Sequence, residues 1–118
     1  MEEQNYDLIE HMERENWWYK GRRDLLSQLL VGKQFQRALD IGCGVGSNLE
    51  VLQQYAQTVL GVDNNQKAVE YCIQKGGNAL LGDVHQLAFA DQYFDIVVCA
   101  DVLEHVDDQK AISEIARV

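Results

Sequence analysis

The sequence predicts an α/β fold: a doubly wound parallel sheet preceded by N-terminal helices. From Gln36 onward, short and nearly continuous apolar runs alternate with segments of helical periodicity. A glycine-rich turn follows the first apolar run, and acidic residues stand at the ends of the first two runs. The 118 residues suffice for one domain, and 47% of them are hydrophobic, so the chain can form a core.

The first 35 residues are expected to be helical and amphipathic. Four leucines fall on one helical face: Leu25, Leu26, Leu29 and Leu30. Ahead of them, the stretch ENWWYKGRR places an aromatic cluster before a basic one. Trp17 and Trp18 are expected to pack in the core, with cation–π contact to a ligand as the alternative. We therefore divide the chain into a helical cap, residues 1–35, and an α/β domain, residues 36–118.

Four apolar runs are expected to be strands that are covered on both faces. They are Ala38–Ile41, Thr58–Val62, Ala79–Leu81 and Ile96–Ala100. Helical patterns separate them, and strand–helix–strand alternation implies right-handed crossovers and a parallel sheet. Only one helix pattern follows the fourth strand, so we expect a domain truncated after that strand. Its apolar sheet edge would favour a homodimer.

Composition disfavours several classes of partner. The net charge of −9 disfavours a nucleic-acid surface and an anionic membrane surface. The acidic start MEEQNYD does not resemble a signal peptide, and Ile96–Ala100 is too short to cross a bilayer. Cys43, Cys72 and Cys99 lie in apolar contexts and are expected to be reduced and buried, in a cytoplasmic protein. No Cys/His spacing indicates a metal site.

The glycine-rich turn lies in the stretch ALDIGCGVGSNLE. Gly42, Gly44 and Gly46 follow the first strand and open a helix, where free N–H groups favour a nucleotide or a carboxylate. The spacing G-x-G-x-G is one residue shorter than the dinucleotide fingerprint, which weakens a nicotinamide site without excluding it. A tight turn that binds no ligand is the other interpretation.

Acidic residues and one histidine follow the later strands. Asp63 lies 23 residues after Asp40 and could accept hydrogen bonds from two ribose hydroxyls, or cap the next helix. Asp83, beside Val84, could bind an adenine amino group, or could be an ordinary turn residue. His105 could be a general base or a substrate contact, or a solvated or capping histidine.

Four ordered stretches together resemble a class I S-adenosylmethionine-dependent methyltransferase with a Rossmann-like sheet. They are ALDIGCGVGSNLE, VLGVDNNQKAVEYC, LLGDVHQLAFADQYFDIVVCADVLEHV and AISEIARV. The resemblance implies S-adenosylmethionine as cofactor and a small molecule as methyl acceptor. It implies that Asp40 and the glycines hold the methionine part, Asp63 the ribose, and Asn64, Asp83 and Val84 the adenine. The Ala100 carbonyl would then accept from the methionine amino group.

The segment ENWWYKGRR is similar to an aromatic–arginine segment that covers the cofactor in many such enzymes. Tyr19 and Arg22 are the residues expected to do so, with ordinary helix packing and a solvated basic turn as the alternative. Direct displacement at a sulfonium needs no covalent nucleophile, and none is evident in the sequence. Two other functions remain open: a non-catalytic S-adenosylmethionine-binding module, and a nicotinamide oxidoreductase domain.

Overall fold

A computed structural model describes residues 5–100 and 108–118 of the chain. A four-stranded sheet lies at its centre with strand order β3-β2-β1-β4, and every pair is parallel. The elements are α1 (Tyr6–Glu15), α2 (Trp17–Leu30), β1 (Phe35–Ile41), α3 (Ser47–Leu52), β2 (Ala56–Asp63), α4 (Gln66–Gln74), β3 (Ala79–Leu81), β4 (Ile96–Cys99) and α5 (Asp108–Arg117). The prediction of a parallel α/β sheet is confirmed.

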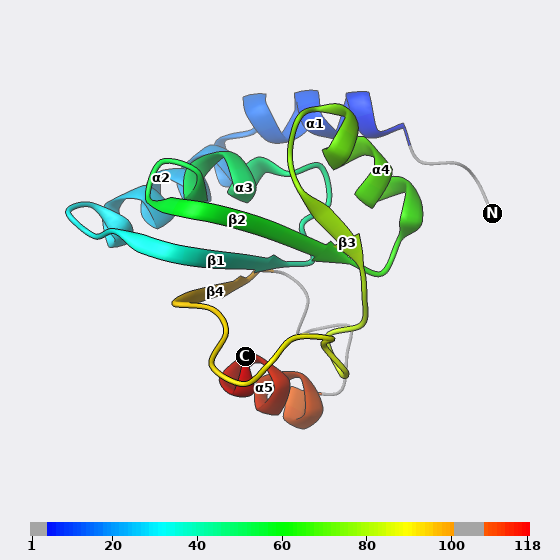
Figure 1. Cartoon of the computed structure of the whole chain (residues 1–118). Coiled ribbons are helices and arrows are strands. Elements are labelled where there is room, and N and C mark those ends of the chain that lie inside the picture. Colours follow the sequence, from blue (N-terminus) through cyan, green and yellow to red (C-terminus); the bar gives the residue numbers. More distant parts are fainter. Residues whose placement is uncertain (1–4, 101–107) are drawn as a thin grey trace.

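Helices cover both faces of the sheet, as in a doubly wound fold. Helices α1 to α4 lie on one side and α5 lies on the other (Figure 1). Side chains alternate along β1: Ala38 packs into the cluster that contains α2, α3 and α4, whereas Leu39 and Ile41 pack into the cluster that contains α5. Because both faces are covered, the buried part of each central strand is apolar, with Asp40 of β1 as the exception.

The register places the carboxyl ends of the strands along one edge. Asp40 pairs with Gly61 of β2 and with Val98 of β4, and Asp63 pairs with Leu81 of β3. In open parallel sheets, ligands bind in the crevice at this edge, where the strand order reverses. In this sheet the reversal falls at β1, between β2 and β4.

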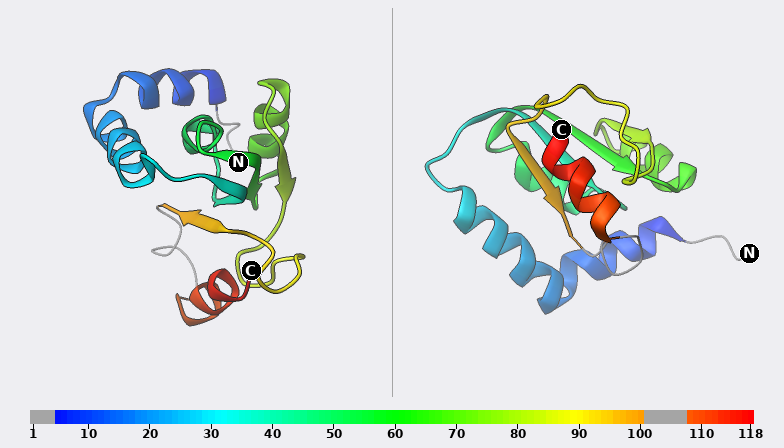
Figure 2. Two further views of the ribbon diagram at one scale, coloured as in Figure 1. Left: turned by 60° about the vertical axis from the view of Figure 1, so that its left-hand side comes forward. Right: turned by 90° about the horizontal axis from the view of Figure 1, so that it is seen from below.

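Helices α1 and α2 lie on the outer side of α3, at one side of the sheet (Figure 2). Asn16 joins them: it caps the end of α1, and its side chain accepts a hydrogen bond from the Trp18 N–H at the start of α2. Among its ten residues, α1 has no buried side chain. Polar contacts attach it instead: Arg14 pairs with Glu50 of α3 at 2.8 Å, and Tyr71 of α4 hydrogen-bonds to α1.

Helix α2 buries only part of its leucine-bearing face, and the expectation that Trp17 and Trp18 pack in the core is wrong. Of the four leucines, Leu30 is buried and Leu26 packs against the core, but Leu25 and Leu29 are exposed. Trp17 is 77% exposed and Trp18 is exposed too, their rings edge to face. The reason is that α2 lies in the outer layer, so only one stripe of its surface meets the core.

The burial of the three cysteines agrees only in part with the prediction from the sequence. Cys43 and Cys72 are buried as expected, whereas Cys99 at the end of β4 is only partly buried. No helix within residues 5–100 or 108–118 combines the length and apolar character needed to cross a membrane.

Candidate functional site

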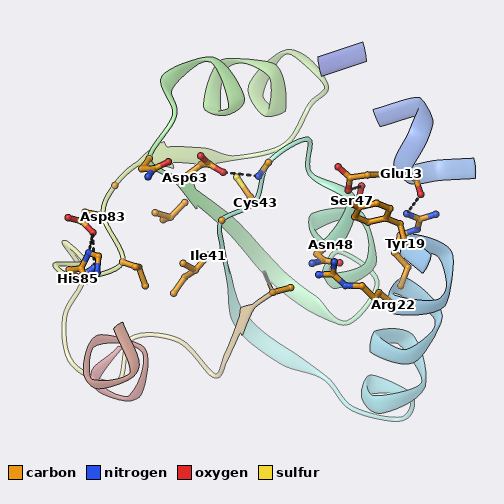
Figure 3. Close-up of a pocket in the computed structure, with 18 residues that line it drawn as sticks. Glu13, Tyr19, Arg22, Ile41, Cys43, Ser47, Asn48, Asp63, Asp83 and His85 are labelled. Atoms are coloured by element: carbon orange, nitrogen blue, oxygen red, sulfur yellow. Dashed lines mark hydrogen bonds and ion pairs between the residues drawn. The ribbon is translucent and has the colours of Figure 1, made fainter. Parts of the chain in front are cut away.

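A cavity of about 610 Å³ opens at the carboxyl ends of the strands. The loop after β1 and the ends of β2 and β3 form its floor and one side, and α1 and α2 form the other side (Figure 3). In the close-up, Asp83 and His85 lie at one end, Asp63 lies in the middle, and Tyr19, Arg22 and Asn48 lie at the other end. The cavity is therefore elongated, with different chemistry at its two ends.

The loop between β1 and α3 is built from left-handed turns. Gly42, Gly44 and Gly46 have φ values of 73°, 53° and 88°. A Cβ built on Gly44 would meet no described atom within 4 Å, so this side of the loop is open toward the cavity. A Cβ on Gly46 would lie 3.3 Å from Sγ of Cys72. Glycine at position 44 therefore allows a ligand to come close to the backbone. Glycine at position 46 allows the turn and leaves room for the Cys72 sulfur.

Asp63 at the end of β2 fixes this loop. Its Oδ2 accepts a hydrogen bond from the Gly44 N–H at 3.0 Å, and its Oδ1 accepts one from the Asn65 N–H at 2.9 Å. Asn65, whose side chain accepts from the Lys67 N–H, is the N-cap of α4. The interpretation of Asp63 as that helix cap is therefore wrong. Each carboxylate oxygen has a second lone pair with which to accept from a ligand.

Asp40 lies behind the loop and does not line the cavity. Its side chain is 1% exposed, and within the described ranges neither carboxyl oxygen has a hydrogen-bond partner. Burial, and then the charge of Asp63, raise the pKa of Asp40 from 3.8 to about 8, against the lowering effect of Arg22.

Asp83, Val84 and His85 form one end of the cavity. Asp83 Oδ1 contacts His85 Nδ1 at 2.6 Å and accepts from the His85 backbone N–H at 2.9 Å. These two hydrogen bonds lower the pKa of Asp83. Val84 is buried and lines the cavity with its apolar side chain. A flat, partly apolar ring with an amino group would fit this end.

Tyr19 and Arg22 lie at the opposite end, where the Arg22 guanidinium sits 5.7 Å from the centre of the Tyr19 ring. Arg23 donates to the Glu13 carbonyl at 2.8 Å and to the Arg14 carbonyl, which fixes the angle between α1 and α2. Glu13 accepts from the Ser47 hydroxyl at 3.0 Å. This bond ties α1 to the first turn of α3.

Most of the residues named from the sequence meet in this cavity. Those that line it are Tyr19, Arg22, Gly42, Gly44, Asp63, Asn64, Asp83, Val84 and Ala100. Asp40 is buried behind the loop, Gly46 is a buried residue of the loop that does not line the cavity, and His105 lies in segment 101–107, outside the described residues. In the described ranges, no group of three or more His, Cys, Asp or Glu side chains could hold a metal ion.

Sequence reasoning missed five polar lining residues: Glu13, Arg23, Ser47, Asn48 and His85. Glu13 reaches the site only through the packing of α1, and no local pattern marks it. Ser47 and Asn48 open α3 directly after the glycines, and His85 stands two residues after Asp83. Their nearness to residues already singled out was a signal that could have identified them.

Comparisons with known proteins agree with this architecture. Residues 39–118 match the family model described as "Methyltransferase domain". The chain is similar to the uncharacterized methyltransferase YcgJ of Bacillus subtilis, with 36% identity over 90 residues that cover 70% of this chain and 36% of that protein. It is also similar to a ubiquinone biosynthesis O-methyltransferase of Methylococcus capsulatus, with 32% identity over 84 residues, 65% of this chain and 35% of that protein.

Solved structures give the same result. The crystal structure of the Bacillus YcgJ protein superposes with a TM-score of 0.76 at 31% identity, covering 84% of this chain and 46% of that one. A SAM-dependent methyltransferase from Archaeoglobus fulgidus gives 0.74 at 27% identity, covering 97% and 53%. The chain spans about a third of the length of the two curated relatives. The match over residues 39–118, joined to a parallel sheet of this topology, shows that the chain belongs to the class I S-adenosylmethionine-dependent methyltransferase family.

Proposed function

We propose that the protein binds S-adenosylmethionine in the 610 Å³ cavity and transfers its methyl group to a small-molecule acceptor. The observation that carries this proposal is the order of chemistry along the cavity (Figure 3). Arg22 lies at one end, Asp63 in the middle, and Asp83 with Val84 at the other end. A ligand with an amino acid at one end, a ribose in the middle and an adenine at the other end matches that order.

The adenosine half would be held by acids and backbone. Asp63 keeps accepting capacity on both oxygens beyond its bonds to Gly44 and Asn65, and so can accept from two ribose hydroxyls. Asp83 can accept from the adenine amino group, while Val84 packs against the ring. Asn64 lies beside this part of the cavity. Together these groups recognise the nucleoside and leave the methyl-bearing sulfur to the other half.

The methionine half would lie over the glycine loop. The Arg22 guanidinium can pair with the carboxylate, and the Ala100 carbonyl can accept from the amino group. Gly42 and Gly44 let the backbone come close. Asp40 lies behind this loop, and its carboxylate form would be favoured by a positively charged ligand above it.

When bound, S-adenosylmethionine supplies an activated methyl group for direct displacement. The chain then has to orient the donor and exclude water. Helices α1 and α2, through Glu13 and Tyr19, close one side of the cavity, and we assign the segment 1–35 as its lid. His105 remains the proposed general base for an acceptor that must lose a proton.

Two observations favour a small acceptor over a nucleic acid. The net charge of −9 disfavours a surface that binds the phosphates of a nucleic acid. A relative with 32% identity is named a ubiquinone biosynthesis O-methyltransferase, and thus bears the name of a small-molecule enzyme. We place the protein in the cytoplasm, consistent with its free cysteines.

Calorimetric titration with S-adenosylhomocysteine, with NAD as the control ligand, tests the cofactor. The 118-residue chain is expected to bind the first and not the second. Asp63→Ala should abolish detectable binding, whereas Asp24→Ala, an exposed acid on α2 that does not line the cavity, should leave it unchanged. Binding of NAD, or no ligand binding by a chain that is folded by circular dichroism, would contradict the proposal.

Methyl transfer is tested separately on the full-length protein with radiolabelled S-adenosylmethionine and a panel of phenols, amines and thiols. Transfer to a member of the panel supports an enzyme. Cofactor binding without transfer to any acceptor would favour the non-catalytic binding module.

A further inference from the structure

Two thiols lie directly behind the glycine loop. Cys43 belongs to the loop and Cys72 to α4, 29 residues later, and their Sγ atoms are 3.9 Å apart. Cys72 Sγ also donates to the Gly44 carbonyl at 3.0 Å. Both side chains are buried, at 6% and 2% exposure, but Cys43 also borders the cavity. The thiol pair therefore connects the floor of the cavity to the helix behind it.

Glycines provide the space for these sulfur atoms. A Cβ on Gly61 of β2 would lie 2.8 Å from both Cβ and Sγ of Cys43. A Cβ on Gly46 would lie 3.3 Å from Sγ of Cys72. The two sulfurs thus share a compartment that any larger residue at Gly61 would close. The two sulfurs already form a hydrogen-bonded pair, so no other atom lies between them.

We propose that Cys43 and Cys72 form a reversible disulfide when a peroxide enters the cavity, and that this bond ties the glycine loop to α4. A disulfide requires about 2.05 Å between the sulfurs, so they must approach by roughly 2 Å. Cys72 then leaves the Gly44 carbonyl, and the loop must shift. That the shift changes cofactor binding rests on the proposed function above.

The chemistry balances with hydrogen peroxide as the two-electron oxidant. The Cys43 sulfur takes one oxygen as the O–O bond breaks, giving a sulfenic acid and one water. The Cys72 sulfur then attacks the Cys43 sulfur: the S–S bond forms, the S–O bond breaks, and the released hydroxide takes the Cys72 proton as a second water. A dithiol such as dithiothreitol reverses the reaction by exchange and is itself oxidised.

The hydrogen bond between the thiols divides the two roles. Donation to Cys72, together with burial, raises the pKa of Cys43, and the same bond lowers the pKa of Cys72. The first step on Cys43 is therefore slow. The second step is fast because the attacking sulfur already lies 3.9 Å from the sulfur that it attacks. The disulfide should accumulate without a lasting sulfenic acid.

The first test is mass spectrometry on the Cys99→Ser chain, since Cys99 is the partly exposed thiol and lies outside the pair. Peroxide should remove two hydrogen atoms from the intact monomer, and a protease digest should yield a peptide pair linked through Cys43 and Cys72. Dithiothreitol should restore the original mass. In Cys72→Ser/Cys99→Ser, which lacks a resolving thiol, peroxide should instead add oxygen to Cys43. A chain that gains oxygen with both thiols present, or stays fully reduced, would overturn the proposal.

The second test measures the loop and the ligand. After oxidation, hydrogen exchange at the Gly44 and Val45 amides should change at least about threefold, a local readout that needs no ligand. S-adenosylhomocysteine should slow oxidation of the reduced chain and should bind the oxidised chain about tenfold more weakly. If the reduced chain does not bind this ligand at all, the proposed function fails, while mass and exchange still decide the disulfide. An oxidised chain with unchanged exchange would overturn the claim that the loop shifts.

Discussion

The backbone N–H of Gly44 donates a hydrogen bond to Oδ2 of Asp63 at 3.0 Å. This bond joins the loop after β1 to the last residue of β2, and the second oxygen of Asp63 holds the Asn65 N–H at the start of α4. The residue that would recognise the ribose therefore also holds the loop that would carry the methionine part. In the proposed complex, loop geometry and nucleoside recognition would be coupled through one carboxylate.

Asp63→Asn should weaken the loop even when no ligand is bound. The amide keeps one accepting oxygen, so one of the two N–H groups loses its partner and meets an NH₂ donor instead. The free energy of unfolding should fall by about 1–2 kcal/mol, measured by urea unfolding without ligand. Asp24→Asn, which removes the same charge from an exposed helix position, should cost far less. Equal losses in the two variants would show that the loop does not depend on Asp63.

Asp40 should make stability depend on pH. Its pKa is raised from 3.8 to about 8 by burial, so the folded state binds a proton that the unfolded state releases. The contribution of Asp40 to the free energy of unfolding is therefore fully present below about pH 4. It is lost as the pH rises toward 8, by up to ~1.4 kcal/mol per pH unit. Asp40→Asn cannot ionise.

Urea unfolding of both chains between pH 5 and pH 8 measures this effect. The stability of Asp40→Asn relative to the parent should increase steadily across that range. A constant difference would mean that Asp40 is already ionised in the folded chain at pH 5.

Gly61 should tolerate no side chain. A Cβ there would lie 2.8 Å from Cβ of Cys43, in the middle of strand β2, so Gly61→Ala should reduce the free energy of unfolding by about 1–3 kcal/mol. Gly21 in α2 is the matched control, because a Cβ there meets no described atom within 4 Å. Gly21→Ala should stabilise the chain by about 0.5–1 kcal/mol through helix propensity. Thermal unfolding followed by circular dichroism ranks the two, and the reverse ranking would contradict the packing described for Gly61.

Arg22 should recognise the carboxylate of the ligand and no other part of that ligand. Arg22→Gln is expected to weaken S-adenosylhomocysteine binding about tenfold or more, since a charge-assisted pair is lost. Binding of 5′-methylthioadenosine, which lacks the amino-acid group, should change little. Lys20→Gln removes the same charge from an exposed position of α2 and serves as the control. Calorimetry that finds both ligands weakened equally would assign Arg22 to helix packing instead.

The exposed sheet edge should promote self-association of the 118-residue chain. In the sheet as described, β4 lies at the end of the strand order and pairs with β1 alone. Unpaired strand edges offer hydrogen-bonding groups to a second copy. Size-exclusion chromatography with light scattering should give a dimer whose fraction rises with concentration. A monomer at all concentrations would remove this expectation.

The sheet could be predicted because strands that are buried on both faces consist largely of apolar residues. Apart from Asp40 and the terminal Asp63, the carboxyl-terminal halves of β1 and β2 are runs without polar residues, and hydropathy predicts them. Exposed polar residues, which include Gln36 and Gln57, lie near the start of these strands, so the strands begin earlier than predicted. Asp63 was identified for the same reason, since an acid that ends an apolar run stands out.

Tertiary packing decided what the sequence could not. Asp40 is the second-last residue of β1 and Asp63 is the last residue of β2, yet Asp40 is buried behind the loop whereas Asp63 lines the cavity. Cys43 and Cys72 meet across 29 residues, a contact that no local pattern encodes. Gly61 was a usable signal, since a glycine inside a strand often marks a close approach.

The attachment of α1 has a consequence for ionic strength. This helix has no buried residue among its ten and is attached largely by charged and polar contacts, among them Arg14 with Glu50 and Lys75 with Asp7. Salt shortens the range of such attractions, from ~10 Å at 0.1 M to ~3 Å at 1 M, and leaves backbone ladders and apolar packing in place. Concentrated salt therefore loosens one wall of the cavity while the sheet stays intact. Affinity for a ligand in the cavity becomes a function of ionic strength even where the ligand itself carries no charge.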